Sequence, residues 1–192
     1  MLRVEEVSCV RGGREVFTDL SLAVATGESL LVRGPNGVGK SSLLRMIAGL
    51  LPCASGRVRF EGTLALADEH PALDPGRRLR EALALWSRVD GADEERIDSA
   101  LSRFGLAPLV DVPVRMLSTG QRKRALLART AASGAELWLL DEPGNGLDAA
   151  SLSVLGAEMD RHLSGGGAII VASHLDLPHG FTRSIDLAMF AS

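Results

Sequence analysis

The first third of the chain has the alternation of hydrophobic and polar positions that is typical of β-strands. Three segments show it: LRVEEV at residues 2–7, REVFTDLSLAV at 14–24 and the shorter GRVRFEG at 56–62. A largely apolar strand, ESLLVRG at 28–34, runs directly into a glycine-rich stretch. The segment that follows, KSSLLRMIAGLL at 40–51, predicts a helix with one buried side. That side is expected to carry Leu43, Leu44, Ile47 and Leu50.

The rest of the chain changes from helices to alternating strands and helices. Residues 77–89 and 93–105 have apolar side chains at helical spacing, and a third helix is predicted over about 118–131. The apolar runs 136–141 and 168–173 then predict two buried strands with one more helix between them, from about 148 to 163. This order predicts an α/β fold with a mixed sheet core, an antiparallel β subdomain at the N-terminus and a short inserted helical subdomain.

Length and composition suit one domain. The chain has 192 residues, and 46% of them are hydrophobic, which is enough for a sizeable core. We expect a single domain over residues 1–192, with a core at about 1–69 and 132–192 and a helical subdomain at about 70–131. No apolar run approaches the roughly 20 residues of a membrane span.

Charge and cysteine content narrow the function further. The net charge of −3 argues against a general binder of polyanions. The start of the chain, MLRVEEVSCV, contains two glutamates and no apolar stretch, so it is not a signal peptide and we expect a cytoplasmic protein. Cys9 and Cys53 are too few for a disulfide framework or a metal quartet and are expected to be small, buried or half-buried thiols.

The stretch GPNGVGKSS, residues 34–42, has the spacing of a phosphate-binding loop, G-x-x-x-x-G-K-[ST], between a strand and a helix. Glycines let successive N–H groups point at phosphate oxygens, and the helix start adds a positive partial charge. We expect Lys40 to neutralise the outer phosphates, Ser41 to ligate Mg²⁺ and Ser42 to donate to an inner phosphate. The expected nucleotide-binding residues are Gly34, Pro35, Asn36, Gly37, Val38, Gly39, Lys40, Ser41 and Ser42.

Two further groups are expected at the same edge of the sheet, because ligands bind at the carboxyl ends of parallel strands. Asp141 and Glu142 follow the first buried strand, and His174 follows the second. Asp141 can hold the Mg²⁺ that Ser41 also touches, through water. Glu142 can polarise a water molecule for attack on the γ-phosphate. His70, His162 and His179 lack a position of this kind.

The stretch LSTGQRKR, residues 117–124, predicts a second anion-binding helix start, with Ser118 as the N-cap. One phosphate loop is already present, so a second such helix start suggests a site that is completed by another copy of the chain. Gln121 precedes Asp141 by 20 residues (141 − 121). The sequence and the spacing resemble the LSGGQ signature of the ATP-binding-cassette (ABC) ATPases.

This resemblance covers essentially the whole chain. GPNGVGKSS resembles the Walker A loop, LWLLDE the Walker B strand, GNGLD at 144–148 the D-loop, and His174 the switch histidine. It implies a RecA-like P-loop NTPase fold, ATP and Mg²⁺ as cofactors, and Glu142 and His174 as catalytic residues. It also implies a head-to-tail dimer in which each ATP lies between the Walker A loop of one subunit and the signature of the other. The residues implied on the partner side are Ser118, Thr119, Gly120, Gln121 and Asp148.

Two positions depart from the family pattern. The family stacks an aromatic side chain on adenine, but this chain contains no tyrosine and has Val10 or Arg11 at that place. The flat guanidinium of Arg11 can stack on the base instead. The family also has a glutamine after a strand in mid-domain, whereas LALADEHPALD has none. By position Glu69 is the best match, and it is the third expected Mg²⁺ ligand beside Ser41 and Asp141.

Three classes of protein share these motifs: the ATPase subunit of a transporter, a soluble cassette that acts on DNA or ribosomes, and a P-loop kinase or GTPase. The signature and the absence of a guanine-reading NKxD-type stretch argue against the third. A soluble cassette that acts on DNA or ribosomes is also disfavoured. The chain has no sustained heptads between the motifs, contains one cassette only and carries a negative net charge. We therefore expect a transporter subunit that binds no nucleic acid.

Within the transporters, RGGREVFTDLSL, LSTGQRKRALLAR, LWLLDEPGNGLD and HLSGGGAIIVASH are similar to the cassettes of cytochrome c maturation. This similarity implies haem handling, separate permease subunits of the CcmB and CcmC type, and a place on the cytoplasmic face of the inner membrane. Another small exporter remains the alternative. The chain ends 18 residues after His174 (192 − 174), so we expect no C-terminal regulatory domain. Two interpretations stay open for Leu73, Leu79, Leu83 and Trp86: a groove for a permease helix, or the core of the helical subdomain.

Overall fold

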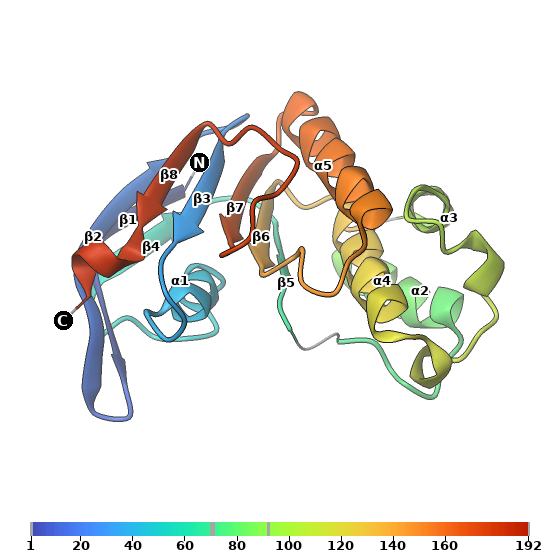
Figure 1. Ribbon diagram of the computed structural model, residues 1–192, viewed down its shortest axis with the longest axis horizontal. Coiled ribbons are helices and arrows are strands. Elements are labelled where there is room, and N and C mark those ends of the chain that lie inside the picture. The colour runs from blue at the N-terminus through green and yellow to red at the C-terminus, as the bar shows by residue number, and fades with distance from the viewer. Residues whose placement is uncertain (1, 70–71, 92, 192) are drawn as a thin grey trace.

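The computed structural model describes residues 2–69, 72–91 and 93–191, and two sheets dominate them (Figure 1). His70 lies outside these described residues. An antiparallel sheet in the order β2-β1-β4 consists of β1 (Leu2–Arg11), β2 (Arg14–Val24) and β4 (Ser55–Phe60). A parallel sheet has the order β5-β6-β7-β3-β8. Its strands are β3 (Ser29–Arg33), β5 (Leu64–Ala67), β6 (Leu137–Asp141), β7 (Ala168–Ala172) and β8 (Arg183–Asp186).

The helices divide between the two faces of the parallel sheet. In Figure 1, α1 (Lys40–Ile47) lies on the same side as the antiparallel sheet, and the remaining helices lie on the other side. These are α2 (Leu79–Asp90), α3 (Glu94–Arg103), α4 (Thr119–Ala132) and α5 (Ala149–Ser164). Short 3₁₀ turns occupy Ala107–Leu109, Val114–Met116 and Leu187–Phe190.

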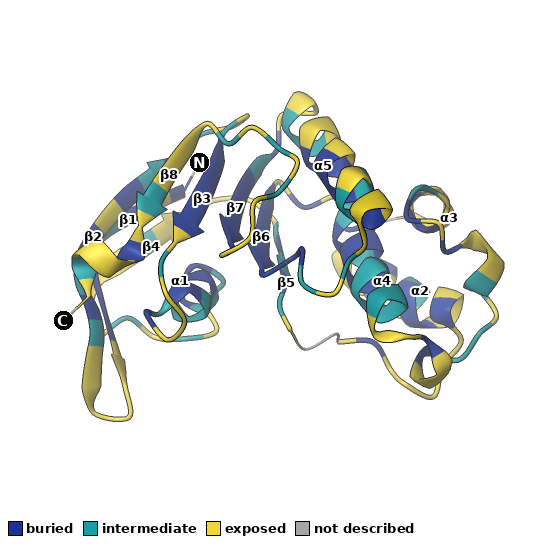
Figure 2. Cartoon of the chain, viewed as in Figure 1, coloured by how far each residue is buried: buried dark blue, intermediate teal, exposed yellow. Residues whose placement is uncertain are grey.

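The central strands are buried on both faces, which explains their continuous apolar runs (Figure 2). Along β6, Trp138 and Leu140 pack with α2–α5, whereas Leu137 and Leu139 pack with α1 and the antiparallel sheet. Because side chains alternate between the faces of a strand, one short segment contributes to both hydrophobic clusters. The α/β class, the N-terminal antiparallel sheet and the inserted helices are confirmed, and the expected mixed core consists of one antiparallel and one parallel sheet.

One predicted core position is wrong. The helix α1 ends at Ile47, and Gly49 with a φ of 71° turns the chain away from the helix axis. Leu50 is therefore 68% exposed, although Leu43, Leu44 and Ile47 are buried as expected. The strand β8 was not predicted, because RSID is short and polar, and its place at the sheet edge comes from pairing with β3.

The apolar side chains of the helical region belong mostly to its core. Leu73, Leu79 and Leu83 are buried, and Trp86 is half-buried with the guanidinium of Arg129 3.8 Å from its ring centroid. This favours the core interpretation over a groove for a permease helix.

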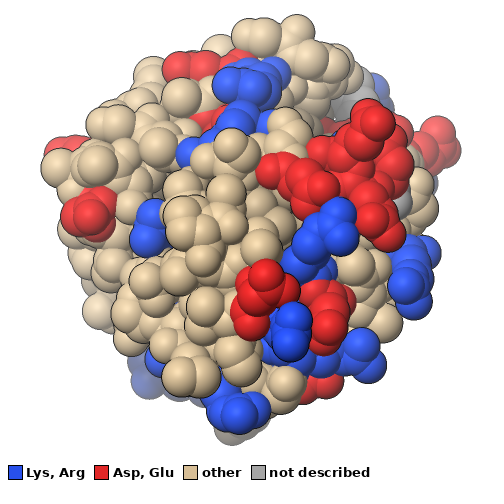
Figure 3. Space-filling model, turned by 90° about the vertical axis from the view of Figure 1, so that its right-hand side faces the viewer, with Lys and Arg blue, Asp and Glu red and all other residues tan. Residues whose placement is uncertain are grey.

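Figure 3 faces the end of the molecule that carries these helices, where acidic side chains gather in one patch with basic side chains beside them. Within the described ranges, no helix is long and apolar enough to cross a membrane.

Candidate active site

A cavity of about 420 Å³ lies at the carboxyl edge of the parallel sheet. It collects the segments that follow β3, β5, β6 and β7, together with the hairpin between β1 and β2, which is where ligands bind in open α/β sheets. Its described lining residues are Arg11, Val16, Asn36, Gly37, Gly39, Lys40, Ser41, Ser42, Glu69, Glu142, Asn145 and His174. Most of these were expected from the sequence, and the fold brings them together from five places in the chain.

The loop between β3 and α1 curls because its glycines adopt positive φ angles: 137° at Gly34, 84° at Gly37 and 105° at Gly39. Helix α1 starts at Lys40 without a side-chain cap at Gly39, so backbone donors at its start face the cavity. The ammonium of Lys40 donates to the carbonyl oxygens of Gly34 at 2.8 Å and Pro35 at 3.2 Å. Lys40 thus ties the loop together and places a positive charge inside it.

Glu142 stands between two partners. Its Oε1 lies 3.9 Å from Nζ of Lys40, and its Oε2 lies 2.9 Å from Nδ1 of His174. The backbone of Glu142 has a φ of 45°, which is uncommon for a residue with a side chain, and its N–H donates to the carbonyl oxygen of Ala172 at 2.8 Å. A carboxylate that is buried, held by two partners and located in a strained turn is typical of a functional position.

Asp141 lies beneath the cavity and is only 3% exposed. Burial raises the pKa of its carboxyl group, and the hydroxyl of Ser41 beside it acts in the opposite direction. Its Oδ1 atom is buried and has no hydrogen-bond partner among the described residues. A buried carboxylate oxygen without a donor, next to a hydroxyl, fits a hard cation such as Mg²⁺.

Within the described part of the chain, no group of three or more His, Cys, Asp or Glu side chains is close enough to hold a metal ion alone. Mg²⁺ keeps several waters and takes few protein ligands besides the substrate phosphates. Glu69 lines the cavity, but it is exposed. Ser41 and Asp141 are therefore the better supported pair, with Glu69 within reach of the same space.

Arg11 lies on the cavity lining at the end of β1, next to the turn formed by Gly12 and Gly13. Val10 is not among the described lining residues, so the geometry favours Arg11 of the two adenine candidates. Val16 and Asn145 also line the cavity and were not predicted. The one available signal for Asn145 was its place three residues after Glu142, inside the D-loop-like stretch.

The signature stretch lies elsewhere. Ser118 caps α4: its hydroxyl accepts from the N–H of Gln121 at 3.2 Å, and the Gln121 side chain accepts from the N–H of Ser118 at 2.8 Å. None of the described lining residues of the cavity comes from α4. A Cβ placed on Gly120 would lie 3.2 Å from the carbonyl oxygen of Gly146, so the signature packs against the D-loop-like stretch of its own chain.

The remaining predicted positions support the loop and the helices around it. Gly34 and Val38 touch each other, since a Cβ on Gly34 would lie 2.9 Å from Cγ1 of Val38. Pro35 contributes the carbonyl oxygen that Lys40 binds. Asp148 caps α5 by accepting from the N–H of Ser151 at 2.8 Å. None of these four residues is on the described cavity lining.

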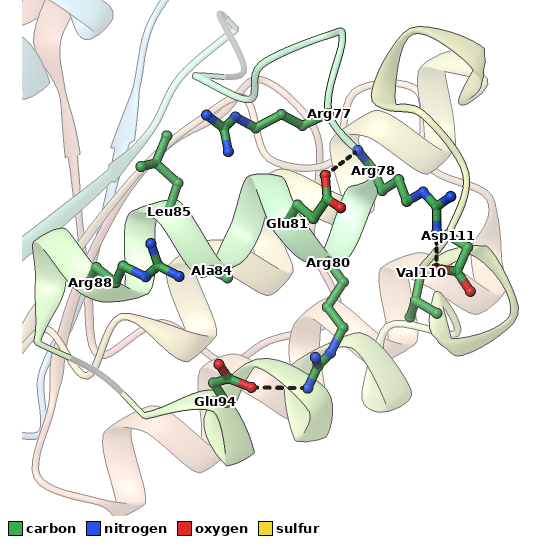
Figure 4. Close-up of a pocket in the computed structure, with 10 residues that line it drawn as sticks. All are labelled: Arg77, Arg78, Arg80, Glu81, Ala84, Leu85, Arg88, Glu94, Val110 and Asp111. Carbon is green, nitrogen blue, oxygen red and sulfur yellow. Dashed lines mark hydrogen bonds and ion pairs between the residues drawn. The ribbon is translucent and has the colours of Figure 1, made fainter.

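A second cavity, of about 340 Å³, lies on the outer side of α2 (Figure 4). Arginines surround it, and ion pairs fix two of them: Arg78 with Asp111 at 3.1 Å, and Arg80 with Glu94 at 3.3 Å. Its described lining residues include no predicted site residue. Among the described residues, this second cavity therefore offers none of the groups expected to bind phosphate or Mg²⁺.

Comparison with known proteins identifies the family. The family profile described as ABC transporter matches residues 17–145. Two curated relatives are each called cytochrome c biogenesis ATP-binding export protein CcmA. The one from Sphingopyxis alaskensis is 52% identical over 92% of this chain and 91% of its own length. The one from Zymomonas mobilis is 47% identical over 100% of this chain and 86% of its own length.

Solved structures agree on the fold. The ATP-binding subunit of an ABC transporter superposes with a TM-score of 0.85 at 24% identity, covering 91% of this chain and 80% of that one. An ABC transporter ATP-binding protein from Pyrococcus furiosus gives 0.87 at 21% identity, covering 100% and 99%. The family profile and the curated relatives, rather than the shared fold, exclude a P-loop kinase or GTPase and imply ATP as the nucleotide. This chain belongs to the ABC transporter family, as an ATPase subunit in the group of the CcmA proteins.

Proposed function

We propose that this chain is the ATP-hydrolysing subunit of an exporter that serves cytochrome c biogenesis, with haem as the handled compound. The observation that carries the proposal is the cavity in which Lys40, Glu142 and His174 meet. Full-length similarity to proteins called cytochrome c biogenesis ATP-binding export protein supports the biological role.

In the proposed reaction, Glu142 takes a proton from the attacking water as it approaches the γ-phosphate. His174 positions that carboxylate through the contact between Nδ1 and Oε2. Nδ1 carries the proton in this contact, because an ionised carboxylate only accepts hydrogen bonds. Lys40 neutralises the outer phosphates, and the N–H groups of residues 34–42 surround them.

Ser41 and Asp141 would hold Mg²⁺, with Glu69 as a third candidate. The ion would neutralise charge on the β- and γ-phosphate oxygens when it is bound. Arg11 would stack on the adenine ring at the mouth of the cavity. In this scheme residues 1–69 and 132–192 form the catalytic core, and residues 70–131 form a helical subdomain that carries the signature.

We further propose a head-to-tail dimer in which Ser118, Thr119, Gly120 and Gln121 of one subunit cover the ATP held by the other, with Asp148 near the same boundary. Two features support this arrangement: the signature lies outside the cavity of its own chain, and Ser118 and Thr119 are exposed. The dimer would work on the cytoplasmic face of the inner membrane with separate permease subunits of the CcmB and CcmC type.

The biological role is tested by deleting the gene and measuring covalently bound haem in the c-type cytochromes. We expect a loss that the parent gene restores and that a Glu142→Gln gene does not. Unchanged cytochromes in the deletion strain, with active ATPase in vitro, would point to the alternative of another small exporter.

The shared site is tested with two inactive variants. Ser118→Arg should bind ATP as a single subunit but should not dimerise, because a bulky charge enters the position proposed for the γ-phosphate of the partner. Lys40→Ala should fail to bind the outer phosphates. Mixed together, they form one site with both defects and one with neither, so we expect partial ATPase activity that neither variant has alone.

The head-to-tail site would be contradicted if no mixing ratio restored ATPase activity although circular dichroism showed that both variants were folded. Ser153→Ala serves as the control, because this serine is exposed on α5 and its hydroxyl donates only to the carbonyl oxygen of Ala149 within its own helix. Mixing Ser153→Ala with Lys40→Ala should give the activity expected from dilution of the parent.

A further inference from the structure

A buried hydroxyl holds the turn that carries His174. Ser173 directly follows β7 and is 2% exposed, and its N–H donates to the carbonyl oxygen of Val32 on β3 at 3.3 Å. Its Oγ atom lies 3.0 Å from the backbone nitrogen of Leu175 and 3.0 Å from the carbonyl oxygen of the same residue. The hydroxyl therefore accepts from one backbone group of Leu175 and donates to the other. It closes a tight turn that has His174 at its centre.

The orientation of His174 depends on this turn. Two hydrogen bonds join His174 to Glu142: Nδ1 lies 2.9 Å from Oε2, and the backbone N–H donates to the same oxygen at 3.4 Å. The side chain of His174 is 49% exposed, so packing against neighbouring side chains does not by itself fix the ring. Both donors of one residue reach one carboxylate oxygen only while the backbone at His174 keeps its direction. Ser173 sets that direction.

A second contact on the same segment is exposed to solvent. Arg33, the last residue of β3, lies 3.2 Å from Asp176, but the two side chains are 54% and 92% exposed. Water and salt screen an exposed ion pair, which therefore contributes little to holding a loop. The buried hydroxyl of Ser173, rather than this ion pair, determines the shape of the turn.

We propose that Ser173 is a positioning residue of the ATPase site, whose hydroxyl fixes the turn of residues 173–175 and so aims the ring of His174 at Glu142. This inference rests on the proposed catalytic role of Glu142 and His174. Ser173 is not on the described cavity lining, so it acts through His174 and not on the nucleotide. Its contribution to turnover should therefore disappear when the ring of His174 is removed.

Steady-state kinetics test this dependence. With MgATP, Ser173→Ala should lower kcat about 10-fold and leave KM for ATP within about 2-fold, because the phosphate loop is untouched. Ser173→Thr, which keeps the hydroxyl, should recover most of kcat. In a His174→Ala background, Ser173→Ala should lower kcat by less than about 2-fold. An equal 10-fold loss in both backgrounds would overturn the inference. If Ser173→Ala does not fold, Ser173→Cys replaces it, because a thiol is only a weak donor and acceptor.

Ser133→Ala is the matched control. Ser133 lies at the C-terminus of α4 and is 8% exposed. Its hydroxyl accepts from the N–H of Ala135 at 3.2 Å and donates to the carbonyl oxygen of Thr130 at 2.7 Å. It bridges a turn as Ser173 does, but it is not on the described cavity lining and does not adjoin a residue that is. Both Ala variants should lower Tm by about 3 °C, and Ser133→Ala should keep the kcat of the parent. Equal losses of kcat in the two variants would make Ser173 a residue of stability only.

The tautomer of His174 gives a readout that needs no ATPase activity. In the parent, Nδ1 carries the proton because it donates to Glu142. Proton–nitrogen correlation spectra of the nucleotide-free protein at about pH 8.5, well above the ordinary histidine pKa, should show this tautomer in the parent and in Ser133→Ala. His174→Ala assigns the signals.

In Ser173→Ala the signals of His174 should move toward the tautomer with the proton on Nε2, which histidine prefers in water. An unchanged Nδ1–H tautomer in Ser173→Ala would show that the hydroxyl does not position the ring, and the inference would be wrong. If the parent shows no ATPase activity, the proposed function fails, while the tautomer still decides whether Ser173 aims His174 at Glu142.

Discussion

At the amino end of the parallel sheet the polar side chains bind one another, whereas at the carboxyl end they face a cavity. Ser29, where β3 starts, accepts from the N–H of Thr182 at 3.1 Å and contacts Nε2 of His179 at 3.1 Å. His179 Nδ1 in turn lies 2.7 Å from Oδ1 of Asp160. This Ser–His–Asp chain resembles a catalytic triad, but Ser29 is 1% exposed, so it is closed to substrates and stabilises the fold.

At the carboxyl end of the same strands, a buried polar atom lacks a partner and the backbone is strained. The Oδ1 atom of Asp141 is buried without a described partner, and Glu142 has a φ of 45°. Polar groups that lack partners and strained backbone both lower stability, and they persist where a ligand uses them. One end of the sheet therefore contributes stability, and the other end contributes chemistry. Substitutions at the two ends should therefore change different measurements.

The largest expected effect is at Glu142. Glu142→Gln removes the proposed base and should lower ATP turnover by about 10²-fold or more, while ATP binding is retained because the phosphate loop is intact. Glu136→Gln is the matched control, since Glu136 directly precedes the amino end of β6 and is exposed. Steady-state ATPase rates and nucleotide titration measure both variants. If Glu142→Gln and the parent hydrolysed ATP at equal rates, the carboxyl end of the sheet would not be the catalytic end.

The second effect concerns strain in the phosphate loop. Gly39→Ala should lower the free energy of unfolding by about 1–3 kcal/mol and weaken ATP binding. At this position φ is 105°, and a Cβ would lie 2.7 Å from Cγ1 of Val16 and 2.9 Å from Cδ1 of Phe17. Gly37→Ala, with a φ of 84° and no described atom within 4 Å of the new Cβ, isolates the backbone cost alone. Urea unfolding of both variants should show the larger loss in Gly39→Ala.

Part of the site was predictable from local patterns in the sequence. The phosphate loop, Asp141, Glu142 and His174 are each placed by a local rule: a fixed spacing, or the end of an apolar strand. Arg11 and Glu69 were found by resemblance, and both line the cavity. Val16 could not be found, because only the approach of the β1–β2 hairpin brings it to the phosphate loop. For Asn145 the sequence offered one signal, its place three residues after Glu142, and the turn after β6 brings it to the cavity.

The contact of Lys123, the fifth residue of α4, with the end of β6 was not predicted for a related reason. On a helix with basic neighbours at Arg122 and Arg124, nothing in the sequence separates a solvated lysine from a half-buried one that donates to the backbone carbonyl oxygen of Asp141. The strand β8 and the exposure of Leu50 likewise depend on sheet pairing and on the turn at Gly49. Local patterns therefore predicted the elements and the chemistry, and tertiary packing decided which charges meet.

At the amino end, Ser29→Ala should lower stability and leave catalysis intact. The substitution leaves the N–H of Thr182 and the Nε2 atom of His179 without their partner, which costs about 1–3 kcal/mol in the free energy of unfolding. The ATPase rate per folded molecule should equal that of the parent. Ser153→Ala on the exposed side of α5 should change the free energy of unfolding by less than about 0.5 kcal/mol. A large loss of turnover in Ser29→Ala would contradict the division between the two ends.

The smallest expected effect is a pH dependence at the amino end, carried by His162. Its ring stacks on Trp138 with centroids 4.0 Å apart, Nε2 lies 3.3 Å from the carbonyl oxygen of Ala168, and burial lowers its pKa below the ordinary 6.5. Between those two pKa values the unfolded chain binds a proton that the folded chain does not. The contribution of His162 to stability is therefore present above pH 6.5 and is lost as the pH falls through the folded pKa.

His162→Phe keeps an aromatic ring against Trp138 but does not titrate, so the difference in unfolding free energy between parent and variant should shrink as the pH falls below 6.5. The slope should stay under about 1.4 kcal/mol per pH unit, the most that one proton gives. Urea unfolding at several pH values measures it. A difference that is independent of pH would mean that His162 titrates normally in the folded chain, and that this end of the sheet is more open to water than the carboxyl end.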